Sequence, residues 1–286
     1  MNSTSTIEIA GSAKVQLNNV TKRFKTRRGE VEALQPINLE VKECEFLVLV
    51  GPSGCGKSTL LNLIAGFDFP TSGEVLMDGK KIAAPGPDRM VMFQEHALFP
   101  WLTVLDNIIF GLKCKSKLTP SDRVQIARYY LDLVHLEKFE KSYIHELSGG
   151  MKQRVALARA LAPNPRVLLM DESFASLDAL TRERLYWQVQ ELHGRTKKTI
   201  IFVTHNVREA ACLGDRVLVF ASRPGRIKRE IEINLPRPRN FNDPAVSQYA
   251  SQIMSELRTE LEGDEHAKMD SHSILPIPDH YLADGI

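Results

Sequence analysis

Residues 51–58 carry the clearest chemistry in the chain, because GPSGCGKS fits the pattern GxxxxGK[ST] that binds nucleotide phosphates. The pattern follows the apolar run Glu45–Val50 and precedes the helical run Thr59–Ala65, which is the strand–loop–helix context it requires. Glycines let successive backbone N–H groups converge on phosphate oxygens, and a helix start adds a favourable dipole. We expect Lys57 to reach the β- and γ-phosphates and the Ser58 hydroxyl to ligate Mg²⁺. The predicted phosphate-loop residues are Gly51, Pro52, Ser53, Gly54, Cys55, Gly56, Lys57, Ser58 and Thr59.

Two adjacent carboxylates, Asp171 and Glu172, end the apolar run Arg166–Met170. A strand-end aspartate holds Mg²⁺ in proteins with this phosphate loop, so we assign that role to Asp171. Because the chain leaves the expected sheet here, Glu172 can face the γ-phosphate and act as general base on the attacking water. A second apolar run, Thr199–Val203, ends shortly before His205. We expect this histidine to sense the γ-phosphate and orient the water, because it keeps a donor near neutral pH.

A second anion site is predicted where Ser148, Gly149 and Gly150 open a helical run with apolar positions at Val155 and Leu157. One nucleotide held by one chain does not need two such sites. The sequence therefore predicts that each nucleotide lies between the phosphate loop of one chain and Ser148-Gly149-Gly150 of another.

This second segment also carries a family resemblance, because Leu147–Gln153 reads LSGGMKQ and is followed by RVALARA. With these motifs in order from about Val15 to Pro236, the chain resembles the ATP-binding subunits of ABC transporters. The resemblance implies ATP hydrolysis with ATP and Mg²⁺ bound, and a second ATPase chain as partner.

The same resemblance implies roles for further residues. Phe24 would stack on adenine, although it could instead be a core phenylalanine. Gln94 would touch Mg²⁺ and the attacking water and report occupancy to membrane subunits, and the loop Ser176-Leu177-Asp178 would cross the dimer interface. The expected catalytic residues are Glu172, His205, Gln94 and Lys57; the metal ligands are Ser58, Gln94 and Asp171; and the nucleotide contacts outside the phosphate loop are Phe24, Gln94, Ser148, Gly149, Gly150 and Gln153.

One position departs from the family pattern, since Ser173 stands where a proline commonly follows the catalytic glutamate. Losing proline frees φ and is expected to loosen that turn, but it removes no catalytic group. The intact Lys57, Glu172 and His205 argue against a purely regulatory subunit.

These residues require a scaffold of alternating strands and helices, which runs from Lys14 to about Pro236 and predicts an α/β fold. We expect a P-loop NTPase of the ABC type: a mixed, mostly parallel sheet with an antiparallel β edge and a helical insertion at about 97–160. Residues 1–13 are expected to be disordered. Residues 237–286 form a predicted C-terminal extension with a short amphipathic helix around Ser247–Leu261 and a disordered acidic tail from Glu262. The four predicted strands are Glu45–Val50, Arg166–Met170, Thr199–Val203 and Arg216–Phe220.

Composition narrows the function classes. The 286 residues carry a net charge of only +2, so there is no electrostatic case for a nucleic-acid partner. No apolar run approaches the roughly 18 to 20 residues of a membrane-spanning helix, and the N-terminus lacks a signal-peptide pattern, so partner chains must supply any membrane part. The four cysteines lack paired spacing, which favours reduced thiols in a cytosol. Cys55, near a helix N-terminus and Lys57, is expected to be the most reactive.

Two segments, Phe99–Asn107 and Phe220–Ile227, are similar to the importer branch that carries nitrate, sulfonates and taurine. The resemblance implies two permease subunits, a solute-binding protein acting indirectly, and a peripheral position on the cytoplasmic face of the inner membrane. Trp101 would anchor the permease contact, or else pack within the insertion. Nitrate or nitrite is the first expectation for the substrate, with bicarbonate, cyanate and sulfonates or taurine as alternatives. The two ATPase chains could be alike or unlike, and a non-transport ABC ATPase is a further alternative.

Overall fold

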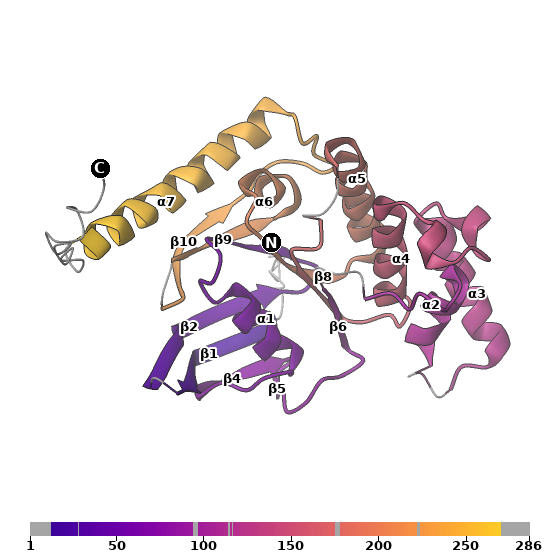
Figure 1. Cartoon of the computed structure of the whole chain (residues 1–286), viewed down its shortest axis with the longest axis horizontal. Helices are drawn as coiled ribbons and strands as arrows, with labels where there is room; N and C mark the ends of the chain where they lie inside the picture. Colours follow the sequence, from indigo (N-terminus) through magenta and orange to yellow (C-terminus); the bar gives the residue numbers. More distant parts are fainter. Residues whose placement is uncertain are drawn as a thin grey trace, which may run out of the picture.

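The phosphate loop follows a central strand of a six-stranded sheet in the computed structural model of the chain (Figure 1). The structure describes residues 13–27, 29–93, 97–113, 115, 117–174, 178–221 and 224–269; of residues 180 and 259–269 it describes the backbone only.

Two sheets form the β part of the molecule. The strands of the antiparallel sheet, in the order β2-β1-β4-β5, are β1 (Ala13–Thr26), β2 (Gly29–Lys42), β4 (Ser72–Met77) and β5 (Lys80–Lys81). The strands of the other sheet, in the order β10-β9-β3-β8-β7-β6, are β3 (Phe46–Val50), β6 (Arg89–Met92), β7 (Val167–Asp171), β8 (Thr199–Thr204), β9 (Arg216–Ala221) and β10 (Arg226–Glu232). This second sheet is parallel except for β10, which pairs antiparallel with β9. The predicted mixed, mostly parallel sheet is confirmed, and each predicted strand lies within one residue of its observed bounds.

The helices cover both faces of the six-stranded sheet. They are α1 (Lys57–Ala65), α2 (Val104–Leu112), α3 (Pro120–Leu133), α4 (Gly149–Leu161), α5 (Ala179–Thr196), α6 (Val207–Leu213) and α7 (Pro244–Met269), with two short 3₁₀ turns, η1 (Glu137–Phe139) and η2 (Ile144–Glu146). Figure 1 shows α2 and α3 at one end of the molecule, where α4 lies between them and the sheet. These helices occupy the range predicted for the insertion.

Strand periodicity explains why there are two hydrophobic cores. Along β3, Phe46, Val48 and Val50 face a core shared with α4, α5 and α6. Leu47 and Leu49 face the opposite core, which α1 and the antiparallel sheet cover. Strands buried on both faces are nearly continuous apolar runs, which the sequence displays directly.

The last helix is longer than predicted. It runs over Pro244–Met269 rather than Ser247–Leu261. Asp243 caps its start, because its Oδ1 accepts a hydrogen bond of 2.8 Å from the Ala245 N–H, and proline is favoured in a first turn. The disordered tail predicted from Glu262 is wrong up to Met269, since good helix formers continue the helix; the remainder lies outside the described residues.

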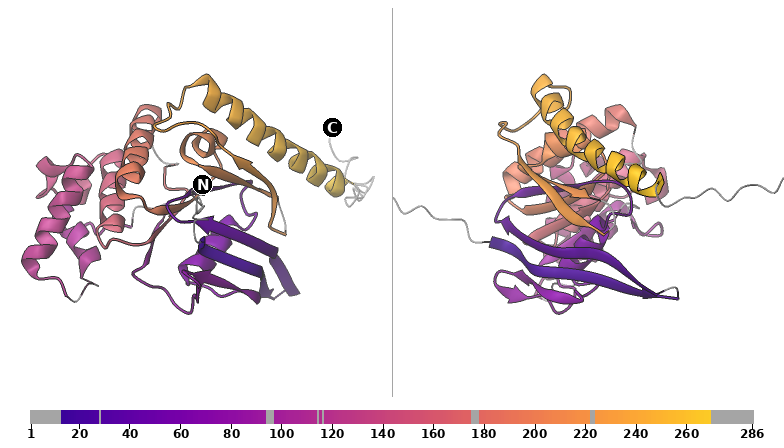
Figure 2. Two further views of the ribbon diagram at one scale, coloured as in Figure 1. Left: turned by 180° about the vertical axis from the view of Figure 1, so that it is seen from behind. Right: turned by 90° about the vertical axis from the view of Figure 1, so that its left-hand side faces the viewer.

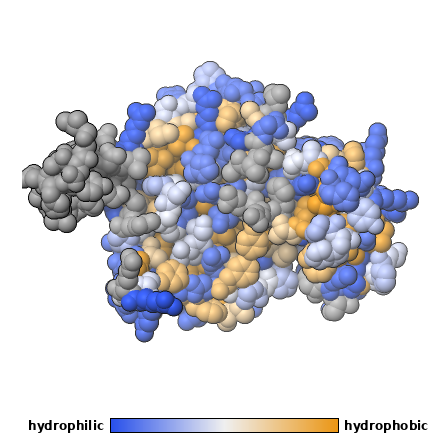
Figure 3. All heavy atoms as spheres, viewed as in Figure 1, coloured by the Kyte–Doolittle hydropathy of each residue, from blue (hydrophilic) through white to orange (hydrophobic). Residues whose placement is uncertain are grey.

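Helix α7 packs on α6 and β9 through Val246, Ala250 and Ile253, which are buried. The two views of Figure 2 place it on the side of β9 and β10 that is opposite to β1 and β2. In the described part of the chain, no helix combines the length and apolarity needed to cross a membrane. On the face shown in Figure 3, hydrophobic residues are interspersed with hydrophilic ones.

Candidate functional site

The phosphate loop lines a cleft of about 400 Å³ at the end of β3. Helix α1 begins at Lys57, directly after Gly56, whose φ of 96° favours glycine. A Cβ at Gly56 would lie 2.6 Å from Leu34 Cδ2, so no side chain fits between the loop and β2. The cleft is lined by Ser53, Gly54, Gly56, Lys57, Ser58 and Thr59 from the predicted loop, by Glu172, and by Val31, Glu32 and Ala33 of β2.

The Lys57 ammonium lies inside the loop. It donates hydrogen bonds of 2.8 Å each to the carbonyl oxygens of Gly51 and Pro52. Both acceptors are neutral, and phosphate oxygens would be stronger, charge-assisted acceptors for the same donor. The loop thus holds Lys57 beside the cleft, within a side-chain rotation of a bound phosphate.

Two oxygen atoms suited to bind Mg²⁺ lie close together beside the phosphate loop. Ser58 Oγ lies 3.1 Å from Asp171 Oδ1, which joins the first turn of α1 to the end of β7. Burial raises the pKa of Asp171, Glu172 raises it further, and Ser58 and Lys57 oppose the rise. Among the described residues no group of three or more His, Cys, Asp or Glu could hold a metal alone. One carboxylate with a hydroxyl is nevertheless the usual protein share of a Mg²⁺ site that phosphates complete.

Glu172 and His205 face each other at the ends of neighbouring strands. Asp171 pairs with Val203 in the parallel β7–β8 ladder, and the Glu172 N–H donates to Val203 O at 2.9 Å. The φ of 43° at Glu172 turns its side chain out of the sheet towards the cleft. His205 Nδ1 then lies 3.5 Å from Glu172 Oε2. The structure therefore brings together the two side chains that the sequence predicted as base and sensor.

The turn after Glu172 is held by Ser173. Its buried hydroxyl donates to Met92 O at 3.3 Å, which ties the turn to β6. The expected loosening from the missing proline is offset by this hydrogen bond.

The Ser148-Gly149-Gly150 segment forms the N-terminus of α4. Ser148 is the N-cap, with its Oγ accepting from the Met151 N–H at 3.4 Å, and Ser148 and Gly149 are exposed. Gly150 is buried against α5. A Cβ at this position would lie 2.2 Å from Thr181 Cγ2, so the close packing of the two helices requires glycine. Among the described residues that line the cleft, none comes from α4. An exposed helix N-terminus that does not line its own cleft is available to a second chain.

Gln153 does not fit its predicted role. Its side chain is 0% exposed, and neither side-chain polar atom has a hydrogen-bond partner among the described residues. It lies on the buried side of α4, so it cannot contact a nucleotide from another chain in this conformation. Gln153 belongs to the segment that carries the family resemblance, but helix periodicity turns its side chain inward.

Phe24 is 40% exposed, which excludes its interpretation as a core phenylalanine. It does not line the cleft, but it pairs with Val31 across the β1–β2 ladder, and Val31 does line it. The Lys22 ammonium lies 4.9 Å from the Phe24 ring centroid. Stacking of Phe24 on adenine stays a prediction.

Cys55 lacks the exposure that its predicted reactivity requires. It is 1% exposed and belongs to the core beneath the loop, with its Sγ accepting from Lys57 Nζ at 3.5 Å. Burial raises the pKa of this thiol, and the nearby Lys57 opposes the rise without overcoming it. The sequence shows the positive charge and the helix start, but it does not show that Cys55 points into the core.

Three predicted residues, Gln94, Ser176 and Leu177, lie outside the described residues. Asp178, the last residue of the predicted interface loop, is exposed and caps α5, accepting from the Thr181 N–H at 3.0 Å.

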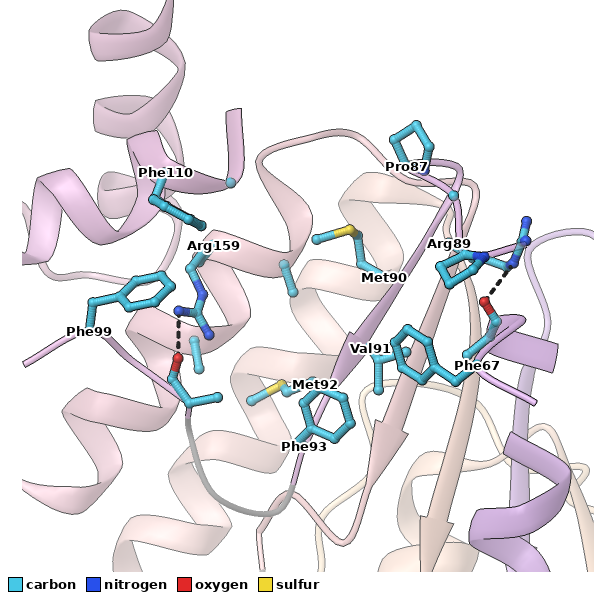
Figure 4. Close-up of a pocket in the computed structure, with 17 residues that line it drawn as sticks. Phe67, Pro87, Arg89, Met90, Val91, Met92, Phe93, Phe99, Phe110 and Arg159 are labelled. Carbon is cyan, nitrogen blue, oxygen red and sulfur yellow. Dashed lines mark hydrogen bonds between the residues drawn. The ribbon is translucent and has the colours of Figure 1, made fainter. Parts of the chain in front are cut away.

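A second, larger cavity of about 660 Å³ lies between β6 and the helices of the insertion. Phe67 and Phe93 stack at 6.1 Å on one side of it. On the other side, Arg159 Nη1 donates to Ala97 O at 2.8 Å and its guanidinium lies 5.6 Å from the Phe99 ring centroid. Figure 4 shows Phe99 and Arg159 on one side of the β6 side chains Met90 and Met92, and Phe67 on the other. No local sequence pattern brings Phe67, Phe93 and Arg159 together, so the sequence alone does not predict this cavity.

The Phe99–Thr103 loop lies at the edge of this cavity, which Phe99 lines. Buried Asn107 holds it, accepting from the Phe99 N–H at 2.9 Å and donating to the carbonyl oxygens of Phe99, Leu102 and Thr103. Trp101 is 71% exposed, which excludes its interpretation as core of the insertion, and it packs against Phe99 at 5.5 Å.

Comparison with known proteins gives a consistent assignment. Residues 34–175 match the family described as ABC transporter. The chain is 46% identical to a nitrate import ATP-binding protein of Synechocystis sp., over 85% of this chain and 95% of the relative. It is 43% identical to an aliphatic sulfonates import ATP-binding protein of Bacillus cereus, with the same coverage of 85% and 95%. A solved dimeric ATP-binding cassette in a post-hydrolysis state, bound to ADP and Pi, is 36% identical with a TM-score of 0.68, covering 78% of this chain and 100% of that one.

Proposed function

This chain belongs to the ABC transporter family and is an ATP-hydrolysing cassette, and we propose that it energises an importer for small anions, with nitrate or nitrite as substrate. The observation that carries the hydrolytic part of the proposal is the facing pair Glu172 and His205 at a cleft built by the phosphate loop, and the similarity to a nitrate import ATP-binding protein supports the substrate. A carboxylate beside a histidine at that point can accept a proton from a water attacking the γ-phosphate.

Within the cleft the residues have separate tasks. Lys57 exchanges its loop carbonyls for the β- and γ-phosphates, and the backbone N–H groups of residues 53–58 bind the phosphate oxygens. Ser58 and Asp171 would hold Mg²⁺, which when bound neutralises charge on the β- and γ-oxygens. Glu172 accepts the proton of the water, and His205 orients that water against the γ-phosphate. Phe24 would stack on adenine, and Gln94 would touch Mg²⁺ and the attacking water, as the family resemblance implies.

A second ATPase chain completes the site. Support comes from the exposed Ser148 cap, which does not line its own cleft, and from the dimeric state of the solved cassette described above. The N-terminus of α4 from one chain would bind the γ-phosphate held by the other. Hydrolysis is then tied to association of the two chains.

The permease subunits dock in the cavity between β6 and the insertion. The lining of this cavity is mostly apolar, and the exposed Trp101 packs on Phe99 beside it. Apolar surface with an aromatic anchor is typical of the centre of a protein–protein interface. Asn107 keeps the Phe99–Thr103 loop in one conformation. Docking there would place the chain peripherally on the cytoplasmic face of the inner membrane, with a solute-binding protein acting through the permease.

The substrate proposal is tested with the assembled complex in vesicles. ATP turnover and uptake are measured with nitrate, nitrite, bicarbonate, cyanate, taurine and an alkanesulfonate. We expect nitrate or nitrite to stimulate both, and a complex carrying Glu172→Gln to show neither. If only a sulfonate or bicarbonate stimulated turnover and uptake, that anion would replace nitrate or nitrite as the proposed substrate. Failure of the chain to co-purify with two membrane proteins would overturn the importer assignment.

A further inference from the structure

A buried carboxylate lies behind the candidate catalytic pair. Glu209 of α6 is 4% exposed, and each of its oxygens accepts a hydrogen bond from a hydroxyl group. Oε1 accepts from Tyr186 Oη of α5 at 2.5 Å, and Oε2 accepts from Thr204 Oγ1 at the end of β8. A buried carboxylate without such donors would be costly, so this arrangement specifies where all three elements lie.

The first branch of this network holds the peptide that carries His205. Thr204 precedes the histidine, and its Oγ1, while donating to Glu209, also accepts from the Asn206 N–H at 3.0 Å. Asn206 follows the histidine and caps α6, with its Oδ1 accepting from the Arg208 and Glu209 N–H groups at 2.9 and 3.3 Å. Both neighbours of His205 are thus fixed, while its own side chain stays exposed.

The second branch reaches the turn of Glu172. Tyr186 packs edge-to-face on Phe174, with ring centroids 5.8 Å apart, and Phe174 lies two residues after Glu172. Burial raises the pKa of the Tyr186 hydroxyl, and the Glu209 carboxylate raises it further, so this group remains a donor. Tyr186 also belongs to the helix that follows the predicted interface loop 176–178.

We propose that Glu209 is a positioning residue for ATP hydrolysis, which fixes His205 opposite Glu172 through Thr204 and ties this pair to α5 through Tyr186. Glu209 is buried and does not line the cleft, so it acts through Thr204 and His205 rather than directly. The inference rests on the proposed roles of Glu172 and His205.

The sharpest variant is Thr204→Val, which keeps the shape of the side chain and removes the hydroxyl. We expect kcat of the full chain to fall roughly tenfold to a hundredfold, because a misplacement of about 1 Å can cost a hundredfold. The dissociation constant for MgATP should stay within about twofold, since the phosphate loop is untouched. Thr204→Ser keeps the donor and should restore kcat.

A matched control lies at the other end of the same strand. Thr199 is also buried, and its Oγ1 accepts from the Cys44 N–H at 3.0 Å. Thr199→Val should lower the unfolding midpoint about as much as Thr204→Val while leaving kcat unchanged. Equal loss of kcat in both variants, or full kcat in Thr204→Val, would overturn the proposal.

The same comparison is made in a chain that carries His205→Ala. Because we expect slow hydrolysis there, the rate is measured in single-turnover experiments. If Glu209 and Thr204 act through His205, then Thr204→Val adds no further loss there, and additive losses would contradict the inference. Failure of the underlying function looks different: Glu172→Gln or His205→Ala would then retain wild-type hydrolysis.

Discussion

His205 Nδ1 lies 3.5 Å from Glu172 Oε2, although the two residues belong to different strand ends. The parallel pairing of β7 with β8 aligns those ends, and the positive φ of Glu172 turns its carboxylate towards the cleft. The geometry thus depends on one register and one unusual backbone conformation.

Glu172→Gln should abolish steady-state ATP hydrolysis while leaving ATP binding intact. The amide keeps the shape of the side chain but cannot accept the proton of the attacking water, and a general base contributes about a hundred- to ten-thousand-fold. Turnover and equilibrium nucleotide binding are measured on the same preparation, and a closed, ATP-bound dimer should accumulate. Wild-type turnover in this variant would remove Glu172 from the mechanism.

Ser148→Ala should impair hydrolysis without changing the nucleotide affinity of the monomer. Ser148 is exposed and does not line its own cleft, so its contribution to the site comes from the other chain. Losing the cap of α4 also costs roughly 0.5–2 kcal/mol of stability. Thr119→Ala, which removes the cap of α3, is the control for that cost and should keep hydrolysis. A collapse of monomer affinity in Ser148→Ala would contradict the shared site.

Trp101→Ala should weaken co-purification of the permease subunits while leaving hydrolysis by the isolated chain unchanged. The exposed indole packs on Phe99, which lines the cavity, and tryptophan is enriched among the residues that contribute most to binding. Trp187→Ala is the control, because Trp187 is 50% exposed on α5, a helix that contributes no described residue to the lining of that cavity. Equal recovery of the complex with both alanine variants would exclude Trp101 as an anchor.

Maleimide should label Cys44 before Cys55 and Cys212. Cys44 is half-buried, whereas the other two are buried, and burial raises the pKa of Cys212 to about 11. Peptide mass spectrometry of the full chain gives the order, and Cys44→Ala should remove the early label. Cys55 modified first, with protection by MgATP, would restore the sequence-based expectation.

His193 should make the fold sensitive to acid. Burial lowers the pKa of this imidazole, and Arg237 lowers it further, while its Nε2 lies 3.1 Å from Cys44 O. The unfolded chain therefore binds a proton near pH 6.5 that the folded chain binds only at lower pH. Its contribution to the free energy of unfolding is full above about pH 6.5 and is lost as pH falls through the folded pKa.

Denaturant unfolding between about pH 8 and 5 measures this loss, which His193→Gln should reduce because glutamine does not titrate. His145, which is exposed, provides the control: His145→Gln should keep the wild-type pH profile. An unchanged profile in His193→Gln would assign the acid sensitivity to other groups.

The sequence by itself determined the parts of the site that local patterns encode. Continuous apolar runs fixed the strands, and polar residues at their ends placed Lys57, Asp171, Glu172 and His205 at one edge of the sheet. Ligands of parallel sheets bind at the carboxyl ends of the strands, so the position of each residue directly after a strand was enough to place it at the site. The family and its ATP hydrolysis followed from the same segments.

Only the tertiary structure decided which side chains are accessible and which distant groups meet. Cys55 lies in the core because α1, β9 and β2 close around it, while Trp101 is left exposed by the packing of its loop on Asn107. Glu209 finds Tyr186 and Thr204 on two other elements. Burial and such hydrogen bonds depend on how segments far apart in the chain pack together, and no local pattern of residue types records that packing.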